Sequence, residues 1–413
     1  MALDGRPPNV RAGRERLVIV GAGMATARVL AELGRRCPGR YVVTVVGGER
    51  RPPYNRILLS PLLAGERAVE ELALDDSQAL PGVAYTLCDP VIAIDRDARA
   101  VVAASGARIR YDRLVLAVGS VPLRPEIPGI AFDGVYTFRD LEDAAALIAA
   151  SRTARRAIVV GGGLLGLEAA YGLSQRGVAV TVVHLMPWLM ERQLDAASGA
   201  LLRETLLRRG ISVVLGAETV AITGEGRTTG VVLRDGRELP ADLVVFAVGI
   251  RPNTALARAA NLAVGRGVLV DDALATSDPA ILALGECIEH RGTIYGLVAP
   301  LWEQAVVVAS RLAGDTTVYD GSCSAATLKV SGVELYSTGR TVAGPADEEI
   351  IYEDPGAGIY RKLVLRDGRL AGAVLLGDAR DGAWYGELMR QQADISRMRA
   401  DLVFGRAFAD HAA

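Results

Sequence analysis

Two glycine-rich segments are the parts of this sequence best suited to hold a phosphate-bearing ligand. The first has glycine at Gly21 and Gly23, and the second has the complete glycine-x-glycine-x-x-glycine pattern at Gly161, Gly163 and Gly166. Each follows a short apolar run and precedes a helical pattern, so a pyrophosphate can lie on the free N–H groups at the start of a helix. Two such matches in the same context make chance unlikely and predict dinucleotide binding.

The residues around these segments fit the pattern unequally. The third glycine position of the first segment is Thr26, although Gly or Ala is usual there because helix and strand pack closely. About 20 residues further on, an acid should accept the ribose hydroxyls, and Glu49 is the candidate. A solvated surface acid is an equally good interpretation of Glu49. In the second segment the corresponding strand ends on His184, which leaves the choice between NADH and NADPH open.

A third candidate is the pair Gly285-Glu286, which ends an apolar run. In flavoproteins with two dinucleotide sites, an acid at this point lies beside the ribityl chain of FAD and accepts hydrogen bonds from its hydroxyls. The alternative is a turn acid that solvates the end of a strand. Downstream, Pro300 is expected as the first residue of a helix through Leu312. The positive end of that helix could stabilise negative charge on a reduced flavin.

The elements that carry these residues occur twice along the chain. Segment 16–33 returns as segment 156–173, and each copy combines a β-branched strand, a glycine turn and a helical stretch. A second pair of similar segments, 111–122 and 240–252, contains an apolar run that ends on Val-Gly. The sequence therefore predicts two copies of one nucleotide-binding unit.

The order of the apolar runs predicts the fold class. Buried strands of parallel sheets are expected at 17–20, 42–46, 114–118, 157–160, 178–183, 243–248 and 281–284. Helices are expected between them at 24–35, 140–151, 164–176, 195–209 and 300–312. After residue 323 the pattern changes to alternating strands at 326–330, 333–337, 348–352, 360–366 and 370–376, with a helix from about 381. We therefore predict an α/β protein with two Rossmann-like, doubly wound parallel sheets and a small α+β C-terminal domain.

Composition excludes several classes of function. The 413 residues predict two or three domains, and a formal net charge of -2 argues against nucleic acid or membrane surfaces as partners. Four cysteines without a C-x-x-C pair and three histidines argue against a zinc site, so no metal is expected. The arginine-rich start lacks the apolar core of a signal peptide, and no apolar stretch is long enough for a bilayer. We expect a cytoplasmic protein.

Together these segments resemble the pyridine nucleotide-disulfide oxidoreductase superfamily, in its FAD-dependent, ferredoxin-reductase-like branch. The resemblance covers nearly the whole chain. More narrowly, five strings look like the flavoprotein portion of the large subunit of NAD(P)H-dependent assimilatory nitrite reductases, at 52–66, 182–195, 284–305, 328–339 and 360–381. That subunit continues into cysteine-rich iron–sulfur and sirohaem regions, whereas this sequence has no cysteine cluster. Nitrite reduction by this chain alone is therefore not implied.

The resemblance implies two cofactors and three domains. FAD would bind the first unit, in contact with Gly21, Gly23, Glu49, Arg56 and Glu286. NAD(P)H would bind the second, in contact with Gly161, Gly163, Gly166 and Glu168. In similar enzymes the acid equivalent to Glu168 meets the nicotinamide amide, so Glu168 is the catalytic candidate; pairing with an arginine is the alternative. The implied domains are FAD-binding (14–122 and 248–322), NAD(P)H-binding (123–247) and C-terminal (323–413).

The cysteines bear on the reaction. No Cys-x4-Cys follows the first glycine segment, and no cysteine lies in 54–63, where peroxidase-like relatives keep a reactive one. Dithiol, disulfide and peroxide chemistry therefore lack a carrier. We expect an FAD-dependent NAD(P)H oxidoreductase that passes electrons to a protein acceptor, either ferredoxin-like or a nitrate or nitrite reductase component. The alternatives are a ferredoxin or rubredoxin reductase of a monooxygenase system, and a flavin-bound redox sensor without steady turnover. The sequence leaves the acceptor, the nucleotide preference and the oligomeric state open.

Overall fold

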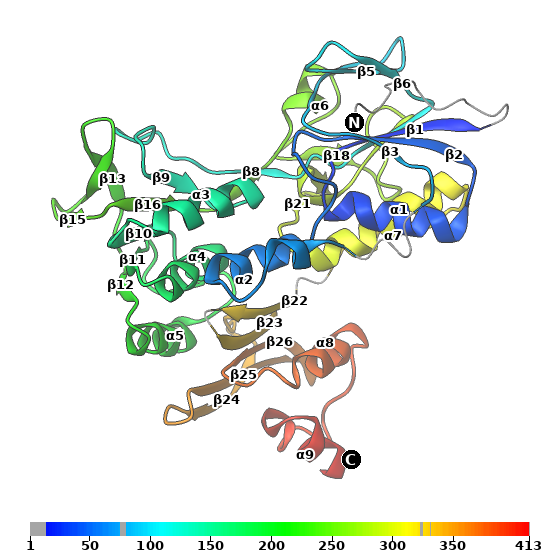
Figure 1. The fold of residues 1–413 in the computed structure, drawn as a ribbon. Coiled ribbons are helices and arrows are strands. Elements are labelled where there is room, and N and C mark those ends of the chain that lie inside the picture. Colours follow the sequence, from blue (N-terminus) through cyan, green and yellow to red (C-terminus); the bar gives the residue numbers. More distant parts are fainter. Residues whose placement is uncertain (1–13, 75–79, 323–324, 331, 413) are drawn as a thin grey trace. The chain divides into compact units, whose positions relative to one another are not determined.

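The computed structural model describes residues 14–74, 80–322, 325–330 and 332–412. The chain divides into two compact units, each assembled from separate segments (Figure 1). Unit 1 comprises Met1–Asn55, Leu72–Val121 and Ile250–Ser322, and unit 2 comprises Arg56–Glu71, Pro122–Gly249 and Cys323–Ala413. The three-domain division expected from the sequence stays a prediction.

Unit 1 is built on a parallel five-stranded sheet in the order β19-β7-β1-β2-β3. Its strands are β1 (Glu15–Val20), β2 (Tyr41–Val46), β3 (Ala84–Thr86), β7 (Arg113–Leu116) and β19 (Ile281–Ala283). Leu17 and Ile19 of β1 are fully buried, as a central parallel strand requires. The strand order reverses between β1 and β7, which is where open α/β sheets bind ligands.

The other elements of unit 1 pack around this sheet. Helices α1 (Met24–Arg36) and α7 (Val298–Ala313) lie side by side (Figure 1). The remaining elements are α6 (Ala255–Ala259), the antiparallel sheet of β4 (Val91–Asp95), β5 (Ala100–Ala103) and β6 (Arg108–Arg110), and the sheet of β18 (Val268–Val270), β20 (Ile288–His290) and β21 (Thr293–Ile294). Strand β8 (Ser120–Pro122) pairs with β17 (Ile250–Pro252).

Unit 2 repeats the same sheet. Its parallel strands run in the order β12-β11-β10-β16-β9, with the reversal between β10 and β16. The strands are β9 (Val135–Thr137), β10 (Arg156–Val160), β11 (Ala179–Val183), β12 (Ser212–Val214) and β16 (Leu243–Phe246). Around them lie α2 (Leu59–Ala64), α3 (Leu141–Ser151), α4 (Leu164–Gln175), α5 (Ala196–Arg208) and the antiparallel strands β13 (Thr219–Gly224), β14 (Thr228–Leu233) and β15 (Glu238–Pro240). The predicted internal repeat is therefore present in three dimensions.

The C-terminal part of unit 2 is an antiparallel sheet in the order β22-β23-β26-β25-β24. Its strands are β22 (Ala325–Val330), β23 (Val333–Gly339), β24 (Glu348–Asp354), β25 (Ile359–Arg366) and β26 (Arg369–Leu376), followed by α8 (Gly382–Arg390) and α9 (Arg406–Ala412). The β25–β26 hairpin turns through Asp367 (φ +51°) and Gly368 (φ +70°), the two positive φ angles that a type I′ turn needs.

The predicted fold class is confirmed, and one helix start is wrong. Helix α7 begins at Val298, so Pro300 is its third residue and not its first. The first N–H groups of a helix have no intrahelical acceptor, so proline is tolerated throughout the first turn and does not fix the boundary. The sequence patterns did not predict α2. Within the described ranges, no helix combines the length and apolar composition needed to cross a bilayer; the cytoplasmic location stays a prediction.

The third position of each glycine segment shows how the helix packs on the turn. A Cβ at Gly166 would lie 2.0 Å from the carbonyl oxygen of Gly161, so a side chain there has no room. In the first segment the equivalent residue, Thr26, is buried, and its Oγ1 donates a hydrogen bond of 2.6 Å to the carbonyl of Gly21. Thr26 thus bonds to the carbonyl of Gly21, whereas Gly166 places no side chain against the equivalent carbonyl of Gly161.

We predict that one added methyl group destabilises the ligand-free protein much more at Gly166 than at Gly163. Gly166→Ala should lower the free energy of unfolding by about 2 to 4 kcal/mol, because the new Cβ strikes a backbone carbonyl. Gly163→Ala should cost about 1 kcal/mol or less, because no atom lies within 4 Å of a Cβ built there. Urea unfolding of both variants measures the difference, and equal losses would contradict this packing.

Candidate nucleotide-binding sites

The two glycine turns have the same geometry. Gly21 has φ +108° and Gly161 has φ +120°, a region that side chains other than glycine rarely adopt. A Cβ would lie 2.2 Å from the carbonyl oxygen of Ala117 at Gly21, and 2.3 Å from that of Ala247 at Gly161. These two alanines occupy matching places in the second pair of similar segments. Each turn therefore needs glycine for its backbone conformation and for its close approach to the neighbouring strand end.

The second glycine of each turn leaves open space at a helix start. Gly23 and Gly163 are the N-cap residues of α1 and α4, and no atom of the described chain lies within 4 Å of a Cβ built on either. Neither helix has a side-chain cap, whereas α3 and α5 begin with Asp140 and Asp195, whose carboxylates accept a first-turn N–H. Open space beside uncapped N–H groups fits the pyrophosphate of a dinucleotide.

Two acids of unit 1 follow strands of the parallel sheet. Glu49 comes after β2, and its Oε2 accepts a hydrogen bond of 2.8 Å from the hydroxyl of buried Tyr54. Glu286 comes after β19, and its Oε2 accepts one of 2.7 Å from the hydroxyl of Ser120. Both acids are half-buried. Neither Tyr54 nor Ser120 was predicted from the sequence, although they lie in the segments 52–66 and 111–122 described above.

The turn that carries Glu286 is fastened to helix α7. The N–H of Gly285, which has φ +90°, donates to Oε1 of buried Gln304 at 2.8 Å. The amide nitrogen of Gln304 donates in turn to the hydroxyl of Tyr319 at 3.3 Å. These bonds fix the backbone immediately before the acid.

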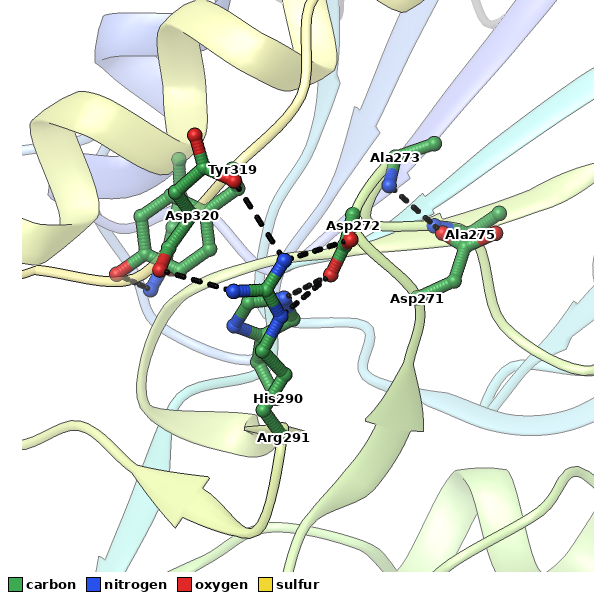
Figure 2. Close-up of polar contacts among 9 residues, drawn as sticks. Asp271, Asp272, Ala273, Ala275, His290, Arg291, Tyr319 and Asp320 are labelled. Carbon is green, nitrogen blue, oxygen red and sulfur yellow. Dashed lines mark hydrogen bonds and ion pairs between the residues drawn. The ribbon is translucent and has the colours of Figure 1, made fainter.

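A second cluster fixes the chain that follows the acid (Figure 2). Asp272 lies 2.9 Å from Nε2 of His290 and accepts two hydrogen bonds from the guanidinium of Arg291, of 2.9 and 2.7 Å. The Arg291 guanidinium, and after it His290, lowers the pKa of the Asp272 carboxyl to about 2. The ring of Tyr319 packs on that of His290 with 4.9 Å between centroids. These contacts hold the chain shortly after Glu286.

Glu168, the catalytic candidate, lies on α4 and meets helix α2. Ser60 Oγ donates a hydrogen bond of 2.6 Å to Oε2 of Glu168. Burial raises the pKa of this carboxyl to about 7, and the bond from Ser60 opposes that rise. Its partner among the described residues is thus a hydroxyl, and not the arginine of the alternative interpretation. Ser60 was missed by the sequence analysis.

Helix α2 packs closely on α4, which brings Ser60 to Glu168. A Cβ at Gly172 would lie 2.7 Å from Cγ of Leu63, so glycine permits the close approach of the two helices. At the other end of α2, the guanidinium of Arg176 donates to the carbonyl of Leu63 and, at 3.1 Å, to that of Leu62. The Leu62 carbonyl also accepts from the N–H of Gly65 at 3.1 Å, so Arg176 adds to the backbone bond that ends the helix. The position of Ser60 is therefore set by contacts along the whole of α2.

The remaining two candidates are placed as follows. Arg56 belongs to unit 2, in the short turn Arg56–Leu58, and its Nη1 donates to the carbonyl of Arg139 at 3.4 Å. The other residues expected to contact FAD belong to unit 1, so a role for Arg56 stays a prediction. Pro300 is buried in the first turn of α7.

The described cysteines are free thiols. Cys287 is fully buried, its Sγ lies 3.2 Å from the carbonyl of Leu284, and burial raises its thiol pKa to about 11. Cys37 is half-buried with a pKa also raised by burial, and Cys88 is exposed. Cys323 lies outside the described residues. A thiol that stays protonated at neutral pH is a poor nucleophile, so Cys287 is a small buried side chain, as expected.

The chain matches known proteins over nearly its full length. Residues 15–309 match the family model of the pyridine nucleotide-disulphide oxidoreductases, and residues 325–393 match that of the rubredoxin NAD+ reductase C-terminal domain. A solved structure, the ferredoxin reductase for the CYP199A2 system from Rhodopseudomonas palustris, is 29% identical with a TM-score of 0.84. The alignment with that structure covers 97% of this chain and 100% of that one.

Two curated relatives come from Bacillus subtilis (strain 168). A nitrite reductase (NAD(P)H) is 43% identical over 387 residues, which are 93% of this chain and 48% of that protein. An assimilatory nitrate reductase electron transfer subunit is 38% identical over 393 residues, which are 94% of this chain and 51% of that protein. The chain spans about half the length of these relatives. The resemblance inferred from the sequence is confirmed.

The raised pKa of Glu168 predicts a pH-dependent stability. The pKa of Glu168 is 4.5 in the unfolded chain and about 7 in the folded protein, so the folded protein binds the proton more tightly. This preference adds to the free energy of unfolding below pH 4.5, and the contribution is lost as the pH rises through 7. Glu168→Gln lacks this titration. Between pH 4.5 and 8 the variant should therefore gain up to about 3 kcal/mol over wild type in free energy of unfolding.

Urea unfolding at both pH values measures this gain. Glu204 is an exposed residue of α5, so Glu204→Gln is a matched control that removes the same charge and should give no pH-dependent difference. A difference between Glu168→Gln and wild type that does not change with pH would contradict the raised pKa.

Proposed function

The chain belongs to the pyridine nucleotide-disulphide oxidoreductase family, and on that premise we propose that it is an FAD-dependent NAD(P)H oxidoreductase that delivers electrons to a protein acceptor. The observation that carries the proposal is the pair of glycine turns with the same geometry, one in each unit, each followed by an uncapped helix with open space at its start. Two separate dinucleotide sites are what a reductase of this kind needs.

The residues of unit 1 would bind FAD. When bound, FAD supplies the capacity to take two electrons from a nicotinamide and to release them singly. The turn at Gly21 and Gly23 would hold the pyrophosphate at the start of α1, and Glu49 and Glu286 would accept hydrogen bonds from hydroxyl groups of the cofactor. Tyr54 and Ser120 orient these two carboxylates through the bonds described above. The N-terminus of α7, with Pro300 in its first turn, would stabilise negative charge.

The residues of unit 2 would bind NAD(P)H. The turn from Gly161 to Gly166 would hold its pyrophosphate at the start of α4, and Glu168 would meet the nicotinamide carboxamide. A protonated Glu168 can donate to the amide oxygen, and an ionised one can accept from the amide nitrogen. Because Ser60 holds Oε2, the contact with the ligand would use Oε1 of Glu168. Both forms exist near neutral pH, since the pKa is about 7.

The acceptor we propose is a nitrate or nitrite reductase component. The two Bacillus relatives support this choice by their names and by an identity of 38% or more over nearly the whole of this chain. A ferredoxin-like acceptor is the second candidate. It is favoured by the match, over the full length of both chains, to the ferredoxin reductase of Rhodopseudomonas palustris.

Two valine substitutions test the division of labour between the turns. Gly23→Val should abolish FAD binding, because a branched side chain would occupy the space proposed for the pyrophosphate of FAD. Gly163→Val should leave about one FAD per chain but slow NAD(P)H-driven flavin reduction by about 100-fold or more. Flavin absorbance and stopped-flow reduction measure both. A wild type that cannot be reconstituted with FAD, or loss of both ligands in Gly163→Val, would refute the proposal.

The cysteines should be dispensable. Replacing Cys287 and the other three by Ala or Ser should leave the rate of ferricyanide reduction by NAD(P)H within about threefold of wild type, because the proposed reaction uses no thiol. A threefold change in rate corresponds to less than about 1 kcal/mol in the activation barrier. Steady-state assays of the FAD-loaded protein measure it. If Cys287→Ala alone stopped turnover while FAD stayed bound, a thiol would take part in the reaction. Tight FAD binding with negligible turnover in wild type would instead favour the redox sensor.

A further inference from the structure

We propose that Glu191, held against the glycine turn of unit 2 by His184, makes the second nucleotide site select NADH over NADPH. The inference rests on the proposed function, because it concerns the ribose of the nucleotide that this turn would bind. It names a specificity-determining carboxylate where the sequence pattern offered only a histidine.

His184 connects the glycine turn to a carboxylate. It follows β11 directly, at the place where an acid usually binds the ribose, and its side chain is buried. The N–H of Gly162 donates to Nδ1 of His184 at 3.0 Å, so Nδ1 carries no proton and the hydrogen of the neutral ring is on Nε2. Nε2 lies 3.1 Å from Oε2 of Glu191 and donates to it. The imidazole thus fixes the carboxylate beside the turn.

A second, independent contact holds the same segment. The carbonyl of Gly162 accepts a hydrogen bond of 3.0 Å from the N–H of Met190, the residue before Glu191. A Cβ at Gly162 would lie 2.6 Å from Cδ2 of Leu189, so the segment folds back tightly onto the turn. The backbone N–H and C=O of Gly162 are therefore both used to place Glu191. Its side chain keeps 25% exposure, and the contact with His184 uses Oε2.

The chemistry of the position favours a hydroxyl over a phosphate. A carboxylate accepts hydrogen bonds from a ribose hydroxyl, whereas NADP sites accommodate the 2′-phosphate with an arginine. A phosphate carries a charge of about -1.5 to -2 at neutral pH, which a carboxylate repels. The two residues after His184, Leu185 and Met186, have exposed apolar side chains. Arg192, the next residue after Glu191, is exposed and would favour a phosphate. The preference of the wild-type protein for NADH or NADPH therefore shows whether Glu191 or Arg192 determines the selectivity.

The test compares the two nucleotides on the FAD-loaded protein. Wild type should show a kcat/KM for NADH about tenfold or more above that for NADPH, with ferricyanide as acceptor. Glu191→Gln should lower this ratio by about fivefold or more, because it removes the repulsion of the phosphate and weakens the bond to the hydroxyl. Glu204→Gln, with the same charge change on exposed α5, should leave the ratio unchanged.

Each outcome separates the inference from the function beneath it. A wild type that prefers NADPH, or a Glu191→Gln ratio within about twofold of wild type, overturns the role of Glu191 and leaves the reductase standing. If the FAD-loaded protein oxidised neither nucleotide, the proposed function would fail. Calorimetric titration with NAD+ and NADP+ would then measure the same preference without turnover. The ratio is taken on one preparation, so a smaller folded fraction in a variant does not alter it.

Discussion

The structure depends on one steric constraint, the close approach of each glycine turn to the end of the neighbouring strand. At Gly21 and Gly161 the backbone passes so near the carbonyls of Ala117 and Ala247 that a Cβ would overlap them. This approach brings the carboxyl ends of two parallel strands together at the reversal of the strand order. It also aims the start of the next helix at that point. The uncapped N–H groups of α1 and α4 are therefore available to a ligand.

The acids proposed to act on ligands share a second feature, a neutral hydrogen-bond donor on one carboxylate oxygen. The donors are hydroxyls or an imidazole, in the pairs Tyr54–Glu49, Ser120–Glu286, Ser60–Glu168 and His184–Glu191. A neutral donor fixes the orientation of a carboxylate without cancelling its charge. Glu32 on α1 differs from Glu168 in this respect, because its buried carboxylate pairs with three arginines of its own helix, Arg28, Arg35 and Arg36. The charge of Glu32 is therefore offset within its own helix.

The C-terminal sheet shares unit 2 with the second nucleotide turn through one buried aspartate. Asp195 caps α5, and its Oδ2 accepts hydrogen bonds from the hydroxyl of Tyr360 at 2.7 Å and from Nζ of Lys362 at 3.0 Å. Lys362 also pairs with Glu349 of β24, so one ammonium group is shared by two carboxylates. Burying a charge without such partners would be costly. This contact joins helix α5 to the C-terminal sheet within unit 2.

The sequence by itself determined the fold class, the internal repeat and the glycine positions, because these follow from local patterns. A strand, a positive-φ glycine and a helix start lie within ten residues of one another, so their order can be read directly. Tertiary structure alone decided which groups meet the acids. Ser60 and Glu168 are 108 positions apart, and their contact exists because Gly172 lets α2 pack on α4. Glu191 could not be predicted from the sequence for the same reason. Its carboxylate lies near the turn because the segment 185–190 folds back onto Gly162.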